Sequence, residues 1–113
     1  MEQPNKPTNL IEVLRQIKKR PAMFLGRKKN IITMSYFIDG YTYAILIHNL
    51  QNKDPLAHNF NDFHDFTAKW LHRTMNGIGW PQMITEFCNG DEEKALDIFF
   101  DIFEEYANTK SNI

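Results

Sequence analysis

Apolar residues in this chain recur every three or four positions, in blocks separated by proline, glycine and asparagine. The first block predicts a helix over residues 10–19, because its leucine, valine and isoleucine positions share one face. Thr8 or Asn9 can cap this helix through its side-chain oxygen. Pro21 ends the pattern, so we expect a loop over residues 20–29.

A second, longer block predicts a helix from about Ile32 to Leu50. Gly40 weakens its middle by about 1 kcal/mol relative to alanine. Short apolar runs are ambiguous, so strands at residues 31–35 or 42–47 stay open at this point. One face of this helix is shared by Phe37, Tyr41, Ala44, Ile45 and His48.

The second half predicts three more helices. Residues 51–60 have loop composition, and Asn61 or Asp62 can cap a third helix that runs to about Met75. Its aromatic stripe, expected in the core, consists of Phe63, Phe66, Trp70 and a neighbouring Phe60. After a break at Gly77 and Gly79, a short helix begins near Pro81 and stops at Asn89-Gly90, and a final helix runs from Asp91 to about Ala107.

These blocks predict a mainly α protein, a compact single-domain bundle of about five helices over residues 1–113, with residues 1–7 and 108–113 frayed. Hydrophobic residues make up 42% of the chain, enough for a core without metals or disulfides. Cys88 is the one cysteine, so no internal disulfide can form. Because the chain also shows no secretory or membrane-spanning pattern, we expect a cytoplasmic location.

Charge is distributed unevenly along the chain, although the net charge is only -1. Residues 1–30 hold eight Lys or Arg against two Glu, a balance of +6, whereas residues 86–113 hold eight acids against two Lys, a balance of -6. The two ends can therefore pair with each other in the fold, or one of them can face a charged partner.

Catalytic and cofactor patterns are not evident in the sequence. His58, Asp62 and His64 invite a metal hypothesis, but their spacing matches no helical metal-ligand signature. Nucleophilic catalysis needs a base beside Cys88, which we interpret instead as a small buried side chain. We therefore expect no metal, no cofactor and no enzymatic activity.

The segment Arg20-Pro21-Ala22-Met23-Phe24-Leu25-Gly26 resembles the Arg-Pro-Gly-Met-Tyr-Ile-Gly segment of gyrase-type ATPases. In those enzymes it accompanies a Glu-Asn box on the next helix and Gly-rich ATP-binding motifs. Here Phe37-Ile38-Asp39-Gly40-Tyr41 contains no such Asn, and no Gly-rich segment follows. A buried turn anchored by Met23, Phe24 and Leu25 is the simpler interpretation.

The final helix carries the most informative pattern. Five acids lie within an arc of about 120° on its surface, and Phe100 adjoins that arc. Acids four residues apart repel one another, at a cost of a few tenths of a kcal/mol per pair. Either a solvated face, or one answered by the protein's own N-terminal lysines, or an electronegative surface for a basic partner accounts for them. We call this the acidic ridge: Glu93, Asp97, Asp101, Glu104 and Glu105, with Phe100 expected at its edge.

The basic half suggests an alternative, a small nucleic-acid-associated regulatory protein. Its phosphate contacts would come from Lys18, Lys19, Arg20, Arg27, Lys28 and Lys29. The sequence pI of about 6.4 argues against this reading, because nucleic-acid-binding domains usually carry an overall basic excess.

The overall pattern resembles small bacterial immunity proteins of contact-dependent growth inhibition and related toxin systems. The resembling residues are the Arg20–Gly26 turn, the Phe37–Tyr41 helix, Phe63-His64-Asp65-Phe66, Gly79-Trp80 and the acidic-aromatic final helix. The resemblance implies a protein that binds a cognate toxin domain, often a nuclease, and covers its active site or substrate-binding surface. On this hypothesis the acidic ridge contacts a basic toxin.

Overall fold

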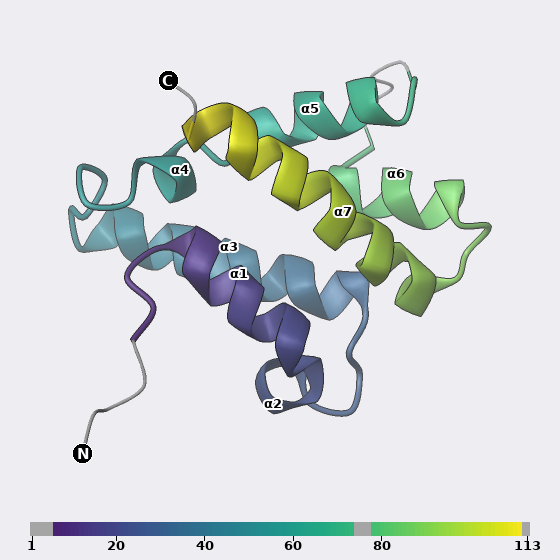
Figure 1. Cartoon of the computed structure of the whole chain (residues 1–113), viewed down its shortest axis with the longest axis horizontal. Helices are drawn as coiled ribbons and strands as arrows, with labels where there is room; N and C mark the ends of the chain where they lie inside the picture. Colours follow the sequence, from purple (N-terminus) through teal and green to yellow (C-terminus); the bar gives the residue numbers. More distant parts are fainter. Residues whose placement is uncertain (1–5, 74–77, 112–113) are drawn as a thin grey trace.

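The computed structural model describes residues 6–73 and 78–111, and within them it is built from helices joined by short loops, with no strand (Figure 1). The prediction of a mainly helical protein is confirmed, whereas the predicted number of about five helices is wrong. The seven helices of these residues are α1 (Leu10–Lys19), α2 (Pro21–Leu25), α3 (Ile31–Ile47), α4 (Pro55–His58), α5 (Asp62–Trp70), α6 (Trp80–Phe87) and α7 (Glu92–Ser111).

The two additional helices are short and begin at prolines in segments predicted to be loops. Pro21 and Pro55 each occupy a first helical position, where the missing N–H costs no hydrogen bond. Gly26, at φ +72°, ends α2 in a conformation that favours glycine. The segments 31–35 and 42–47, where strands stayed open, both lie in α3.

Local signals placed most helix ends correctly. Asn9 caps α1 by accepting a hydrogen bond from the N–H of Glu12, and Asp91 accepts one from the N–H of Lys94 at the start of α7. Helix α6 ends just before Asn89 and Gly90, which both have positive φ. The predicted end of the third helix at Met75 lies outside the described residues, and α5 itself ends at Trp70.

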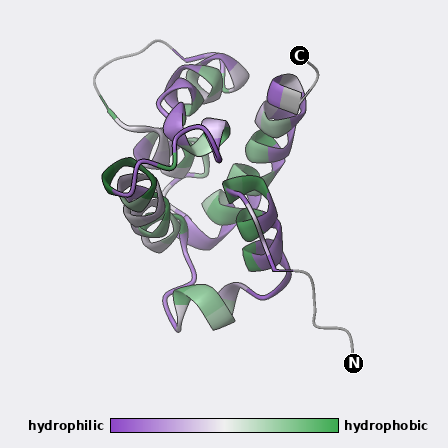
Figure 2. Ribbon diagram, turned by 90° about the vertical axis from the view of Figure 1, so that its left-hand side faces the viewer, coloured by the Kyte–Doolittle hydropathy of each residue, from purple (hydrophilic) through white to green (hydrophobic). Residues whose placement is uncertain are grey.

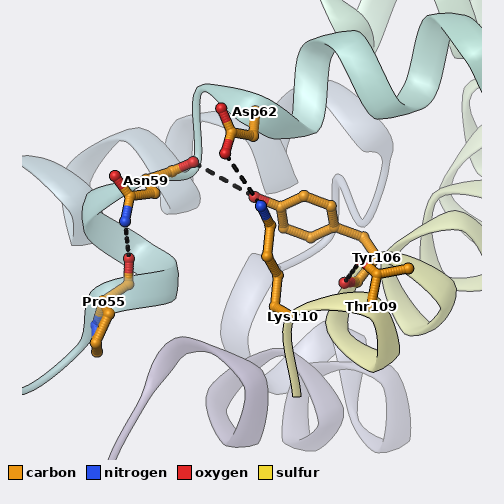
Figure 3. Close-up of polar contacts among 6 residues, drawn as sticks. All are labelled: Pro55, Asn59, Asp62, Tyr106, Thr109 and Lys110. Atoms are coloured by element: carbon orange, nitrogen blue, oxygen red, sulfur yellow. Dashed lines mark hydrogen bonds and ion pairs between the residues drawn. The ribbon is translucent and has the colours of Figure 1, made fainter. Parts of the chain in front are cut away.

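Helix α7 runs to Ser111, beyond the expected end at Ala107, because its last turns have tertiary partners (Figure 3). The hydroxyl of Tyr106 donates to the backbone oxygen of Asn59 at 3.4 Å. The ammonium of Lys110 lies 3.1 Å from a carboxylate oxygen of Asp62 and 5.4 Å from the centre of the Tyr106 ring. Burial raises the pKa of Tyr106 to about 12, and the nearby Asp62 carboxylate adds to the shift.

The aromatic part of the core lies between α5, α6 and α7, and α1 and α3 add buried aliphatic side chains such as Leu14 and Ile38. The ring of Phe63 lies 5.5 Å from that of Phe99 and 5.2 Å from that of Tyr106, in edge-to-face geometry. Trp80 stacks on Phe99 at 5.1 Å. The prediction of a buried stripe is confirmed for Phe60 and Phe63, whereas Phe66 and Trp70 are only partly buried.

Buried Asp54 connects three helices in the first half of the chain. Its carboxylate accepts hydrogen bonds from the N–H of Leu10 at 2.9 Å, the hydroxyl of Tyr41 at 2.6 Å and the N–H of Ala57 at 3.4 Å. The side chain therefore caps α4 and joins it to α1 and α3. Burial, together with this carboxylate, raises the pKa of the Tyr41 hydroxyl.

None of the described helices is long and apolar enough to cross a membrane.

Candidate protein-binding surfaces

The acidic ridge lies along one exposed face of α7, as its helical spacing predicted. Glu93, Asp97, Asp101 and Glu105 are exposed, and the side chain of Glu104 keeps 32% of its surface accessible. Lys94 is the only basic residue of α7 before Lys110. The carboxylates therefore form an electronegative strip along α7 from Glu93 to Glu105.

Partners within the chain engage the C-terminal end of the ridge. Arg15 of α1 binds Glu104 at two points, with Nε–Oε1 at 2.9 Å and Nη2–Oε2 at 3.0 Å, and this contact lowers the pKa of Glu104. The indole N–H of Trp70 donates to Glu105. Glu93 lines a hollow of about 430 Å³ whose other walls carry Arg27, Lys28, Lys29 and further acids.

Asp97 and Asp101 form the centre of the ridge, and they differ from Glu104 and Glu105 at its C-terminal end. Neither makes an ion pair or side-chain hydrogen bond within residues 6–73 and 78–111. The pairing between the two charged ends of the chain, which the sequence left open, takes place at Glu104, through Arg15. Its middle keeps an unanswered negative charge.

Phe100 does not lie at an exposed edge of the ridge. Only 5% of its surface is accessible, and its ring contacts that of Phe99 at 5.3 Å. The expectation of an exposed aromatic anchor is wrong because α7 packs against three helices, α3, α5 and α6, which cover a wider arc of its surface than one neighbour would. Leu96, on the same edge, is buried for the same reason.

Besides Arg15 and Lys18, which act on Glu104, the basic residues of the N-terminal half lie in two places. Arg27, Lys28 and Lys29 face the start of α7, where acids line the same hollow. Lys19 and Arg20 instead line a hollow of about 560 Å³ with Met23, Phe24 and Lys6. Met23 is 72% exposed, so it does not anchor a buried turn, and Leu25 takes that role.

The sequence reasoning missed an apolar surface on α3. Tyr36, Tyr43, Leu46 and Ile47 are 70%, 63%, 52% and 53% exposed. Helix α3 is apolar on nearly every side, and the residues that it buries are Ile31, Met34, Ser35, Ile38 and Ile45. The face grouped by sequence is only partly buried: Ile45 is in the core and Phe37 and Tyr41 pack against it. Ala44 and His48 are exposed. Figure 2 shows α3 nearly end-on at the left, with its green last turn at the surface and the C-terminal turns of α7 on the opposite side.

A signal for this surface was present in the sequence. Residues 36, 40, 43 and 47 share one helix face, opposite the face formed by residues 31, 34, 38 and 45. Between Ile31 and Ile47 the only charged side chain is that of Asp39. A helix with two apolar faces has either two partners within its own chain or one partner outside it.

A groove of about 580 Å³ lies beside this face, between α3 and the segment that holds α4 and the start of α5. Its polar lining residues include Asp39, Thr42, His58, Asn61 and His64. Within the described residues, no group of three or more His, Cys, Asp or Glu side chains is placed to hold a metal ion. Burial raises the pKa of the Cys88 thiol, which disfavours the nucleophilic thiolate.

Comparison with known proteins identifies no match among family models, curated proteins or solved structures.

Proposed function

We propose that this chain is an immunity protein, one that binds a cognate bacterial toxin domain in the cytoplasm and neutralises it. The observation that carries the proposal is the unpaired centre of the acidic ridge, Asp97 and Asp101, on consecutive turns of the exposed face of α7. The toxin is a protein with a basic active-site or substrate-binding surface, as a nuclease has. The chain acts by covering that surface and has no catalytic role of its own.

Electrostatics supports this choice of surface. Carboxylates at positions 93, 97, 101 and 105 repel one another along the helix, and each such pair costs a few tenths of a kcal/mol. Within the described residues, only Glu104 and Glu105 of the ridge have side-chain partners, Arg15 and Trp70. Glu93 shares a hollow with basic residues but makes no ion pair with them. A basic partner would relieve the repulsion at the centre and would be steered toward it during diffusion.

The test measures binding of the full chain to the toxin domain encoded beside its gene, over a salt series. Asp97→Asn with Asp101→Asn should lower the association rate and flatten its salt dependence, because exposed charges act mainly on encounter. The matched control is Asp65→Asn with Glu86→Gln, which removes the same charge from α5 and α6. Equal rates for the two double variants would remove the ridge from the interface. The absence of any toxin gene beside this one would instead count against the immunity function itself.

A further inference from the structure

The exposed face of α3 has three features that a purely solvated helix face does not need. We call it the tyrosine face: Tyr36, Asp39, Gly40, Tyr43 and Ile47. Three large side chains of this face are more than half exposed, two of them tyrosines. Rigid, amphipathic tyrosine side chains are enriched in protein interfaces because they bury a large area at little entropic cost. No described segment of the chain covers them.

Gly40 is the second feature. It lies in the middle of a 17-residue helix, where glycine is unfavourable, and a Cβ added there would meet nothing within 4 Å outside the helix's own backbone. Packing inside this chain therefore gives no reason for the missing side chain. The gap between Tyr36 and Tyr43 instead allows the backbone of another molecule to approach α3 closely.

Asp39 is the third feature. It is exposed, it is the only charged residue of α3, and its carboxylate accepts no hydrogen bond from the described residues. Tyr36 precedes it by three residues and Tyr43 follows it by four, so both flank it on the helix surface. A carboxylate between two aromatic rings suits a guanidinium or ammonium group, which gains both an ion pair and cation–π contacts.

We propose that the tyrosine face binds an apolar helix of a protein partner, with the partner's backbone against Gly40 and one arginine or lysine on Asp39. This mode corresponds to recognition of an amphipathic helix by an apolar surface. A second copy of this chain fits less well, because α3 offers no Lys or Arg to meet Asp39 and a symmetric dimer would bring two Asp39 side chains together. The inference does not rest on the toxin or on the acidic ridge, which lies on α7.

The test uses a phage library of 18-residue helical peptides, randomised on one face and selected on the immobilised full chain. The selected peptides should carry one arginine or lysine among apolar residues. Tyr43→Ser should weaken their binding at least about tenfold, as expected for an aromatic hot spot. Asp39→Asn should remove most of the preference for the basic residue over glutamine in the peptide.

Gly40→Ala separates binding from folding. It should raise the thermal midpoint by about 2 to 5 °C, because alanine is the better helix former. It should nevertheless lower the affinity for the selected peptides by a factor of at least about five. Asn108→Ala, at an exposed position of α7, is the matched control and should leave peptide binding unchanged. Asp97→Asn with Asp101→Asn should also leave it unchanged, so this test and that of the ridge can fail independently.

Three outcomes would overturn the proposal. The first is a selected set whose binding is insensitive to Tyr43→Ser and Gly40→Ala. The second is a set rich in basic residues without apolar ones, which would indicate the acidic ridge as the binding surface. The third is a full-length chain that sediments as a dimer and becomes a monomer in the Tyr43→Ser variant. The tyrosine face would then bind a second copy of the chain.

Discussion

Arg15 of α1 and Glu104 of α7 form a two-point ion pair, 89 residues apart in the sequence, that joins the basic half of the chain to the acidic half. Both side chains are partly accessible, at 51% and 32%, so water and salt screen the pair. Because of this screening, the pair contributes little to total stability.

We expect Glu104→Gln to lower the free energy of unfolding at neutral pH by about 0.5 to 1 kcal/mol. Because folding lowers the pKa of Glu104, the unfolded state binds the proton more tightly, and the stabilisation is present above the ordinary value near 4.5 and lost below it. The stabilities of the wild type and the variant should therefore converge as the pH falls from about 5 to about 3. Urea unfolding over this range measures the difference, and a constant gap would contradict the assignment.

Phe63→Ala should destabilise the protein by about 3 to 5 kcal/mol, because Phe63 is fully buried at the centre of the aromatic cluster. Trp70→Ala should cost clearly less, since Trp70 is only partly buried. Trp70→Phe keeps most of the ring contacts and removes the indole N–H that binds Glu105. Thermal unfolding of the three variants ranks their losses of stability. A loss for Trp70→Ala equal to that for Phe63→Ala would place Trp70 in the core.

Asp54→Ala should lower the free energy of unfolding by about 2 to 4 kcal/mol, because it leaves the buried N–H of Leu10 and the hydroxyl of Tyr41 without their acceptor. Tyr41→Phe removes only one donor and should cost about 1 kcal/mol. In the double variant the two effects should be less than additive, as for residues in contact. Full additivity in a double-mutant cycle would mean that the Tyr41–Asp54 hydrogen bond contributes nothing.

The nucleic-acid alternative predicts salt-dependent binding to duplex DNA or tRNA. We expect none, because Arg27, Lys28 and Lys29 face acidic residues and the other hollow has three basic lining residues, Lys6, Lys19 and Arg20. A gel shift at about 50 mM salt that disappears near 200 mM would show counterion release from phosphates and favour the alternative. If Lys19→Gln with Arg20→Gln abolished such a shift, the hollow beside Met23 would be its site.

The sequence by itself determined the helical class and most helix ends, because these depend on neighbours along the chain. Asn9 caps α1 with its own side chain, and the residues that follow α6 take positive φ without help from distant contacts. The row of acids on α7 also followed from spacing alone. Local reasoning missed the short helices that begin at Pro21 and Pro55, because proline marks both loops and helix starts. It also placed the end of α3 at Leu50 instead of Ile47 and that of α7 at Ala107 instead of Ser111.

The tertiary structure decided which surfaces are available. Phe100 is buried because three helices pack around α7, and the number of neighbours of a helix is not written in its own periodicity. Helix α3 has two apolar faces, and tertiary packing buries the one with Ile38 and leaves the one with Tyr43 exposed. The pairing of Arg15 with Glu104 likewise depends on how α1 lies against α7. Local patterns determine the elements, whereas competition among apolar faces for a limited core determines which faces stay exposed.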